Sequence, residues 1–560
     1  MIEYSAQVVI VGGGATGVGI LRDLSMRGIS ALLLEQGDLA HGTSSRFHGL
    51  LHSGARYAVK DPVSAKECID ENLILKKIAP NCVVDTGGWF VHTEGDDPQY
   101  VTAWIEGCTK AGIPIREVSL DEARRLEPLL TQKAKRIFEV PDAAVDGFKL
   151  VWANAKSAQN YGGKFLTYHK VEGLLRNEDK VIGVTGKNIT TGEDFVVHSE
   201  FVVNAAGAWA GQVASTIGVP LQVLCDKGTL LAFNQRLFQR VINRLRPASD
   251  GDIFVPHETI TIFGTTSKLV DHPTENQSVE SEINRLLDVG TELLPTIETH
   301  RVIRAFSGVR PLHQEEGDNS ENDGREVSRT FAIIDHEEEN NIQGFVSIVG
   351  GKFSTYRLMA EKVSEIVARK LGNSIPCLTA EERLLPEISG KLIEQAKEIM
   401  SCAVADKMLE RLGDQAEEVL REISQNPRKG QMICECEMVT LAEVEKVIAD
   451  DDTHNLADVR RKTRLGMGTC QGAFCTYRAI SLLIDKGYRK DTLVVELKNF
   501  LNQRWKGIRP VLWGQQLRET ELTRAIYAGL LDLKAEEGLT CGMGSSSAEV
   551  SRDLLREFAR

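Results

Sequence analysis

The sequence contains no run of about 18 or more apolar residues, the length that a bilayer-spanning helix requires. Its first residues, MIEYSAQVVIVGGG, also lack the basic stretch and the cleavage site of a secretory signal. We therefore expect a protein with no signal peptide and no transmembrane segment, which meets a membrane only at its surface or through a partner.

The sequence also lacks the excess of positive charge that is typical of nucleic-acid binding. Its 66 Lys and Arg residues are outnumbered by 79 Asp and Glu residues, and the net charge is −13. This balance argues against nucleic acid as a partner. The apolar content of 42% and the charged content of 26% are ordinary for a globular protein, and the 560 residues predict about three to four domains.

A disulfide framework is a third feature that the sequence does not indicate. The cysteines number eleven, which is odd, and apart from one group of four they stand singly in apolar surroundings. This pattern favours a reducing cytoplasm, with buried single thiols and one functional cluster. The cluster has the spacing Cys-x-Cys … Cys-x4-Cys and consists of Cys434, Cys436, Cys470 and Cys475.

A nucleotide-binding unit is present near the start of the chain. The apolar run QVVIV is followed by Gly12-x-Gly14-x-x-Gly17, a helical pattern and a second apolar run that ends at Glu35. In this context the glycines form a dinucleotide fingerprint. Gly12 permits the tight turn, Gly14 lets the backbone approach a pyrophosphate, and Gly17 lets helix and strand pack closely. The helix N-terminus then faces the phosphates, and Glu35 is placed to accept hydrogen bonds from ribose hydroxyls.

The fingerprint alone leaves FAD and NAD open, but later segments favour FAD. The fingerprint occurs once, so no separate nicotinamide domain is evident. FVVNAAGAWA (201–210) and GFVSIVGGKFSTYRLMAEKV (344–363) each indicate a buried strand that runs into small residues, as a long ligand cradled by several segments requires. Each alone could be an ordinary strand-to-helix turn. We predict these cofactor-binding residues: Gly12, Gly14, Gly17, Glu35, Thr43, Ser44, Gly207, Gly350, Gly351 and Lys352.

The region between these two segments has the composition of β-strands. Segments 227–233, 251–256 and 259–267 indicate strands, the last two joined by a turn at His257 and Glu258, and segments 307–312 and 328–335 continue the pattern. Segment 313–326 is polar and predicts a mobile loop. The expected fold class is therefore α/β, with a Rossmann-like FAD-binding domain interleaved with an antiparallel-sheet substrate domain over 1–372. There follow a helical linker region (373–430), a small helical cysteine-containing domain (431–490), a helical extension (491–535) and a flexible tail (536–560).

The cysteine region carries helix-start signals. Thr440 and Glu443 form a capping-box pattern, and Asn455 begins a second helix. A third helix is expected from about Gln471 to Lys486, which would place Cys470 at or near a helix N-terminus, where thiolate is favoured.

Three interpretations of the four thiols compete. Zinc accepts four thiolates but is usually held by C-x2–4-C pairs. A disulfide between Cys470 and Cys475 would leave the other two cysteines idle. A [2Fe–2S] cluster uses all four beside a flavin. The spacing resembles that of the BFD-like (bacterioferritin-associated-ferredoxin-like) [2Fe–2S] domain, which favours iron–sulfur.

Residues 5–525 as a whole resemble the family of catalytic A subunits of anaerobic glycerol-3-phosphate dehydrogenases. The motifs that carry the resemblance are GGGATGVGI, HGLLHSGARYAVKD, SGVRPL, GGKFSTYRLMAE, GMGTCQG and NQRWKGIRPVLWG. The resemblance implies oxidation of sn-glycerol 3-phosphate to dihydroxyacetone phosphate by hydride transfer to FAD, with electrons leaving through a [2Fe–2S] cluster. It also implies two partners, namely a second flavoprotein subunit with a membrane-bound iron–sulfur subunit beside it. Quinone would be the indirect acceptor, and the chain would lie peripherally on the cytoplasmic face of the membrane.

A phosphate dianion requires fixed cations, and the family's motifs indicate which residues provide them. Lys352 is expected near the flavin ring, and His52 is the leading candidate for the base that takes the C2 hydroxyl proton, with His48 second. In aerobic relatives the motif that matches KGTLLAF carries a histidine, where this chain has Leu230 and Leu231. The resemblance assigns catalysis to His52, Arg310 and Lys352, and substrate binding to Arg56, Tyr57, Arg310 and Arg329.

Two other functions fit parts of the same pattern. A flavin-dependent amine or amino-acid dehydrogenase, acting on opines or hydroxyproline, would present a carboxylate to Arg56 and Arg310. A non-enzymatic role would make the cysteine domain a binding or redox-sensing unit.

Overall fold

The computed structural model describes all residues except 314–323, 326, 328, 488–489, 531–532 and 534–560. The loop expected over 313–326 and the tail expected over 536–560, with Cys541, therefore lie almost wholly outside the described residues.

A six-stranded sheet forms the nucleotide-binding body. Its strand order is β10 (Lys164–Leu166), β3 (Ala31–Leu34), β2 (Val8–Val11), β14 (Phe201–Asn204), β22 (Phe345–Gly350) and β21 (Phe331–Asp335). All neighbours are parallel except β21 and β22. The predicted strands at 7–11, 201–204 and 344–350 are thus confirmed, and the chain returns to this sheet three times after its first βαβ unit.

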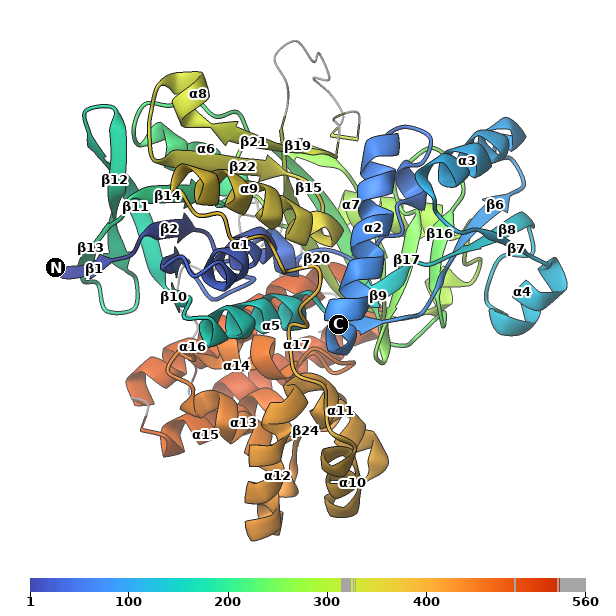
Figure 1. The fold of residues 1–560 in the computed structure, drawn as a ribbon. Helices are drawn as coiled ribbons and strands as arrows, with labels where there is room; N and C mark the ends of the chain where they lie inside the picture. Colours follow the sequence, from blue (N-terminus) through green and yellow to red (C-terminus); the bar gives the residue numbers. More distant parts are fainter. Residues whose placement is uncertain (314–323, 326, 328, 488–489, 531–532, 534–560) are drawn as a thin grey trace, which may run out of the picture.

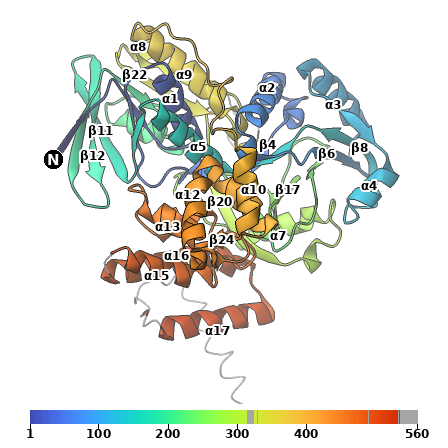
Figure 2. The same ribbon diagram turned by 60° about the horizontal axis from the view of Figure 1, so that its bottom comes forward.

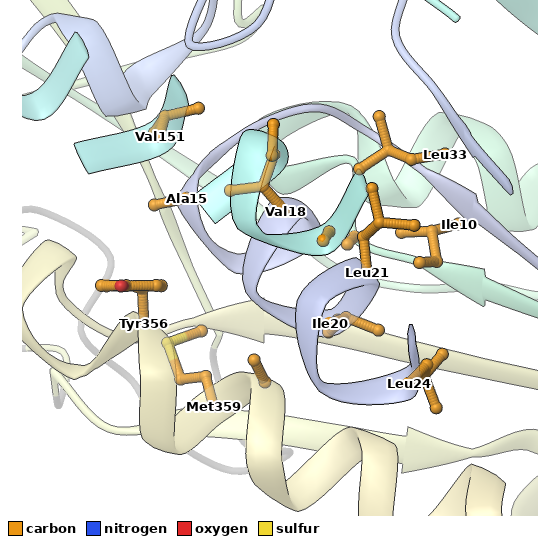
Figure 3. Close-up of a cluster of buried hydrophobic side chains, with 14 of the residues drawn as sticks. Ile10, Ala15, Val18, Ile20, Leu21, Leu24, Leu33, Val151, Tyr356 and Met359 are labelled. Atoms are coloured by element: carbon orange, nitrogen blue, oxygen red, sulfur yellow. The ribbon is translucent and has the colours of Figure 1, made fainter. Parts of the chain in front are cut away.

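Three helices cover one face of this sheet. They are α1 (Ala15–Met26), α5 (Gly147–Asn160) and α9 (Tyr356–Lys370). Val18 and Leu21 of α1 are fully buried with Val151 of α5 and with Tyr356 and Met359 of α9 (Figure 3). A four-stranded sheet packs on the other face, in the order β1 (Ile2–Ser5), β13 (Asp194–His198), β12 (Lys180–Asn188), β11 (His169–Asn177).

A nine-stranded sheet forms the second body. Its path is β19 (Lys268–Val270), β15 (Leu224–Phe233), β18 (Ile260–Gly264), β17 (Ile253–His257), β16 (Val241–Arg244), β6 (Gly88–Thr93), β8 (Ala134–Val140), β7 (Arg116–Val118), and β20 (Val302–Leu312) also pairs with β15. The expected antiparallel sheet is confirmed, with one parallel pair, β16 and β6. Strands β6, β7 and β8, which come from residues before 150, were not predicted from the sequence.

The C-terminal third of the chain is mainly helical (orange to red in Figure 1). It packs against helix α5 of the first body and strand β20 of the second. Helices α10 (Gly390–Ile399), α11 (Cys402–Leu412) and α12 (Ala416–Gln425) share one apolar cluster, to which Leu392, Ile393, Ala396 and Ile399 contribute as their periodicity predicts. Helices α13 (Leu441–Ala449), α14 (Leu456–Thr463), α15 (Cys475–Asp485) and α16 (Lys490–Ile508) surround a second cluster. Helix α17 (Gly514–Leu530) lies at the outer edge (Figure 2).

The segment between α9 and α10 is held along helix α1. The Arg22 guanidinium donates to the carbonyl oxygens of Thr379 (3.3 Å) and Glu382 (2.9 Å), and Arg27 donates to that of Ile375 (2.7 Å). Both arginines are buried. This linker is therefore fixed to the nucleotide-binding body.

Two local predictions are wrong. Helix α15 begins at Cys475, because Gln471 and Gly472 have positive φ angles of 52° and 81° and no helix can pass through them. Cys475, and not Cys470, therefore starts the helix. Of the single cysteines expected to be buried, Cys402 is exposed and Cys377 is half-buried. Among the described residues no helix combines the length and the apolar character needed to cross a membrane.

Candidate functional site

A cavity of about 1530 Å³ lies between the two sheets and is lined by the glycine turn after β2 and by the basic residues Arg56, Arg310, Arg329 and Lys352. Pockets for single drug-sized ligands usually measure about 300–1000 Å³. The cavity therefore has room for a dinucleotide and a small substrate together.

The three fingerprint glycines have different roles in this structure. A Cβ on Gly12, whose φ is +112°, would lie 2.6 Å from the carbonyl oxygen of Ala205, and a Cβ on Gly17 would lie 1.9 Å from that of Gly12. Gly12 and Gly17 are thus required by the protein's own packing. A Cβ on Gly14 would meet only Ser44 Oγ, at 3.1 Å, and Gly14 lines the cavity. The space in front of Gly14 is where the backbone can approach a pyrophosphate, so the turn fits FAD.

The surrounding polar residues are arranged around the N-terminus of α1. Ser44 Oγ accepts a hydrogen bond from the Ala15 N–H at 2.9 Å, and Thr43 donates to the carbonyl of Val309 at 2.6 Å. The Glu35 carboxylate lines the cavity and accepts from the N–H groups of Gly13 and Gly37, both at 2.7 Å. Burial raises the pKa of Glu35, and these N–H groups oppose the rise.

The expected flavin-side residues also line the cavity. Gly207, Gly350 and Gly351 have positive φ angles, and a Cβ on Gly351 would lie 2.4 Å from Met359 Sδ. Lys352 Nζ donates to Ser64 Oγ and to the Arg329 carbonyl, both at 2.8 Å, and lies 5.0 Å from the centre of the Tyr57 ring. Burial lowers the pKa of Lys352.

Three arginines from distant segments meet at the cavity, and two buried aspartates hold them. Arg56 pairs with Asp252 at 2.9 Å. Arg310 and Arg329 both pair with Asp226, at 2.6 and 3.3 Å. Both aspartates are fully buried, so each guanidinium is fixed on its protein side. Within the described part of the chain, the buried Nη1 of Arg56 has no hydrogen-bond partner.

The charge of this group favours an anion. Arg56, Arg310, Arg329 and Lys352 line the cavity, whereas Asp226 and Asp252 lie behind them and compensate only part of their charge. A phosphate dianion provides enough acceptor oxygens for several fixed guanidinium donors.

Both candidate bases lie in the same cavity. The ring centroids of His48 and His52 are 5.5 Å apart, and His52 lies 5.5 Å from the Tyr57 ring. Burial, followed by the charges of Arg56 and Lys352, lowers the pKa of His52 to about 3. His48 Nδ1 accepts from the Leu50 N–H at 3.1 Å, which leaves its proton on Nε2, and burial lowers its pKa as well. Both imidazoles are therefore neutral and able to accept a proton.

The position where aerobic relatives carry a histidine supplies no base here. Leu230 and Leu231 are buried in β15, and neither lines the cavity.

Sequence reasoning missed Asp226 and Asp252. The available signal was an acid next to an apolar strand, in LCDKGTLLAF and SDGDIFVP, because a carboxylate is rarely buried without a cationic partner.

The four expected cysteines come together in the C-terminal third. Cys434 ends β23 (Met432–Cys434), and its Sγ lies 3.8 Å from that of Cys436, which lies 3.9 Å from Cys470 Sγ. Cys475 contacts both Cys434 and Cys470, which closes a ring of four. Hydrogen bonds among the four thiols lower the pKa of Cys434 and Cys470 and raise that of Cys436 and Cys475.

The ring fits a metal centre and not a single disulfide. All four cysteines are free and converge, and a Cβ on Gly468 would lie 2.7 Å from Cys436 Sγ. Four convergent thiols suit either an iron–sulfur cluster or zinc.

Ion pairs and hydrogen bonds attach this domain to the nucleotide-binding body. Arg461 pairs with Asp38 at 2.5 Å, Arg464 pairs with Asp146 at 2.6 Å, and the Tyr168 hydroxyl donates to Asp458 at 2.6 Å.

Comparisons with known proteins agree with both sites. Residues 7–352 match the family model "FAD dependent oxidoreductase", and residues 432–485 match "BFD-like [2Fe-2S] binding domain". The A subunit of the anaerobic glycerol-3-phosphate dehydrogenase of Escherichia coli (strain K12) is 42% identical over 539 residues, 96% of this chain and 98% of that protein. The corresponding A1 subunit of Haloferax volcanii is 41% identical over 542 residues, 95% of this chain and 91% of that protein. The structure of the glycerol-3-phosphate dehydrogenase from Bacillus halodurans complexed with FAD shares the fold, with a TM-score of 0.69 at 20% identity over 91% of this chain and 96% of that one.

Proposed function

This chain belongs to the family of anaerobic glycerol-3-phosphate dehydrogenase A subunits, FAD-dependent oxidoreductases with a BFD-like [2Fe–2S] domain, and we propose that it is the catalytic subunit of a complex that passes electrons to quinone. Its substrate would be sn-glycerol 3-phosphate and its product dihydroxyacetone phosphate. The observation that carries the proposal is the set of three cavity arginines, each fixed by a buried aspartate, which suits a phosphate dianion.

The chemistry divides between the cofactors and the protein. FAD, when bound, accepts the hydride from C2 of the substrate, and the [2Fe–2S] cluster, when bound, carries electrons away singly. FAD would be held by Gly12, Gly14, Glu35, Thr43, Ser44, Gly207, Gly350 and Gly351, while Gly17, which does not line the cavity, would support the turn through its packing on Gly12. The cluster would be held by Cys434, Cys436, Cys470 and Cys475.

The protein's own groups would bind the substrate and move its proton. Arg310 and Arg329, fixed by Asp226, would bind the phosphate, with Arg56 and Tyr57 completing the contacts. His52 would accept the C2 hydroxyl proton on its neutral imidazole, and the substrate's negative charge would offset the cations that lower its pKa. Lys352 would stabilise negative charge beside the flavin ring.

We also propose that the chain works within a complex. Its relatives are named as subunits. Two further subunits, one a flavoprotein and the other a membrane-bound iron–sulfur protein, would pass electrons to quinone and hold the chain at the cytoplasmic face of the membrane.

The test is an anaerobic absorbance spectrum of the purified FAD-loaded chain before and after substrate is added. sn-Glycerol 3-phosphate is expected to bleach the flavin band, whereas glycerol, which lacks the phosphate, is not. Bleaching by proline, hydroxyproline or an opine, with none by glycerol 3-phosphate, would refute the proposal and indicate an amino-acid dehydrogenase instead.

A further inference from the structure

Four arginines lie between the cavity and the cysteine ring without carboxylate partners. They are Arg46, which follows the turn Thr43–Ser45, Arg304 of β20, Arg460 of α14 and Arg504 of α16. Across the described part of the chain, none of the four makes an ion pair. Three other arginines of the same region, Arg411, Arg461 and Arg464, all do.

Their contacts run from the cavity to the ring. Arg46 lines the cavity. Arg304 donates to Gln471 Oε1 at 3.4 Å and to the Gln503 carbonyl at 3.2 Å. Arg504 donates to the carbonyls of Gln471, at 2.9 Å, and Cys470, at 3.5 Å. The last arginine of the series, Arg504, therefore contacts the backbone of a ring cysteine.

Arg460 lies beside an aromatic ring and has an unpaired donor. Its guanidinium lies 5.8 Å from the centre of the Phe500 ring, and among the described residues its buried Nε has no hydrogen-bond partner. Arg460 as a whole is half-buried, and a cationic group that is partly removed from water without an ion-pair partner is costly unless a nearby anion compensates it.

The four charges also oppose one another. Burial, followed by Arg460, Arg504 and Arg46, lowers the pKa of Arg304 to about 9. Nearby groups act in the opposite direction: Cys475 and Glu437 raise the pKa of Arg460, and Tyr477, Cys470 and Cys475 raise that of Arg504. The two glutamates beside the ring form their ion pairs with other arginines, Glu437 with Arg464 and Glu435 with Arg478.

We propose that Arg46, Arg304, Arg460 and Arg504 form a cationic bridge that compensates the negative charge of a [2Fe–2S] cluster on the four thiolates and raises its reduction potential. A tetrathiolate cluster is anionic and gains one further negative charge on reduction, so half-buried cations close to it favour the reduced form. The inference rests on the proposed function and adds to it how the protein makes the cluster an effective electron acceptor.

The test is a redox titration of the full chain loaded with FAD and iron, followed through the EPR signal of the reduced cluster. Arg460→Gln and Arg304→Gln each remove one charge and keep a polar side chain. Each change is expected to make reduction of the cluster about tenfold less favourable. This corresponds to a fall of about 59 mV in the reduction potential of a one-electron couple. Arg460→Lys restores the charge and is expected to recover most of the fall.

Arg478→Gln is the matched control. Arg478 lies beside the ring, but it is 44% exposed and paired with Glu435, so water screens its charge and the potential should change far less. Wild-type potentials in both Arg460→Gln and Arg304→Gln, with normal iron and sulfide content, would overturn the proposal.

Retention of the cluster gives a second measurement. If Arg460→Gln loses iron and Arg460→Lys keeps it, charge decides retention and the proposal is supported. Loss of iron in both, with a wild-type potential in Arg304→Gln, would overturn it. Glycerol 3-phosphate takes no part in the titration, so this proposal and the proposed activity fail independently.

Discussion

At the scale of single residues, the cavity depends on side chains that are fixed before any ligand arrives. Arg310 is held by Asp226 and by the hydroxyl of Thr265, and it packs over Gly228, where a Cβ would lie 2.2 Å from its Nη2. The guanidinium therefore loses little conformational entropy when an anion binds, which favours tight and specific binding.

Arg310→Ala is expected to raise KM for glycerol 3-phosphate about ten- to a hundredfold without loss of FAD. A charge-assisted contact contributes roughly 1.5–3 kcal/mol, which gives this range. Steady-state kinetics with a dye acceptor measure the change. Arg285→Ala, which removes a 56% exposed arginine of the same body, is the control and should leave KM unchanged. An unchanged KM in Arg310→Ala would remove this residue from the substrate site.

His52 makes the protein sensitive to acid. Its pKa is about 3 when folded and about 6.5 when unfolded. Between these values the unfolded chain binds a proton at His52 that the folded chain does not. The free energy of unfolding therefore has its full value above about pH 6.5 and decreases as the pH falls towards about 3. At pH 5 the loss from this one group is about 2 kcal/mol.

His52→Asn should remove that part of the acid sensitivity. Urea unfolding of the FAD-loaded chain at pH 7 and pH 5, followed by tryptophan fluorescence and flavin release, measures the difference in unfolding free energy. The pH-dependent difference should be smaller in the variant by about 2 kcal/mol. An equal difference in both proteins would show that His52 is not held neutral by burial.

At the scale of secondary-structure elements, different glycines of the strand–turn–helix unit serve packing and cofactor binding. Gly14→Val is expected to abolish FAD retention and leave the fold and the metal content intact, because the added side chain occupies the space for the pyrophosphate and meets only Ser44. Flavin released from the denatured protein measures occupancy, and circular dichroism measures the fold.

Gly17→Val is the contrasting variant. Its Cβ would overlap the Gly12 carbonyl, at 1.9 Å, so this change should damage the fold as well as FAD binding. Normal flavin occupancy in Gly14→Val would contradict the nucleotide site.

The elements that could be predicted from the sequence are those with strong local signals. The capping box of Thr440 and Glu443 is present with its hydrogen bonds, and Asn455 caps α14 as expected. The start of α15 was misplaced because the left-handed conformation of Gln471 depends on its hydrogen bonds to Met467 and Gly468, which no periodicity reports.

At the scale of the whole molecule, the flavin and cluster sites belong to separate bodies. Cys436→Ser is therefore expected to lower iron and acid-labile sulfide together, while flavin bleaching by glycerol 3-phosphate and turnover with a dye survive. Electron passage to quinone should fail, because the ring that receives electrons has lost one of its four thiols.

Cys402→Ser provides the matched control, since Cys402 is an exposed thiol of the same helical region outside the ring. It should leave iron, sulfide and quinone reduction at wild-type levels. Full quinone-linked activity in Cys436→Ser would place the ring outside the electron path, and stoichiometric zinc in the wild type would refute the iron–sulfur assignment.

Long-range pairings were beyond prediction from one sequence. The motifs indicated Arg56, Arg310 and the four cysteines, because these residues belong to short recognisable segments. The partners Asp252 and Asp226 lie 196 and 84 residues from their arginines. Asp226 and Arg310 lie opposite each other in the antiparallel pairing of β15 with β20, a register that no local pattern in the sequence reports.

The linker that Arg22 and Arg27 hold along α1 has a consequence for kinetics. A free tether would let the cysteine domain swing between the flavin and an outside acceptor, and transfer would then slow as the solvent became more viscous. Here the tether is bound to buried side chains, and Arg461 and Arg464 fasten the domain itself. The gap between the two redox centres is therefore set once, on folding, and the internal transfer rate should be insensitive to viscosity.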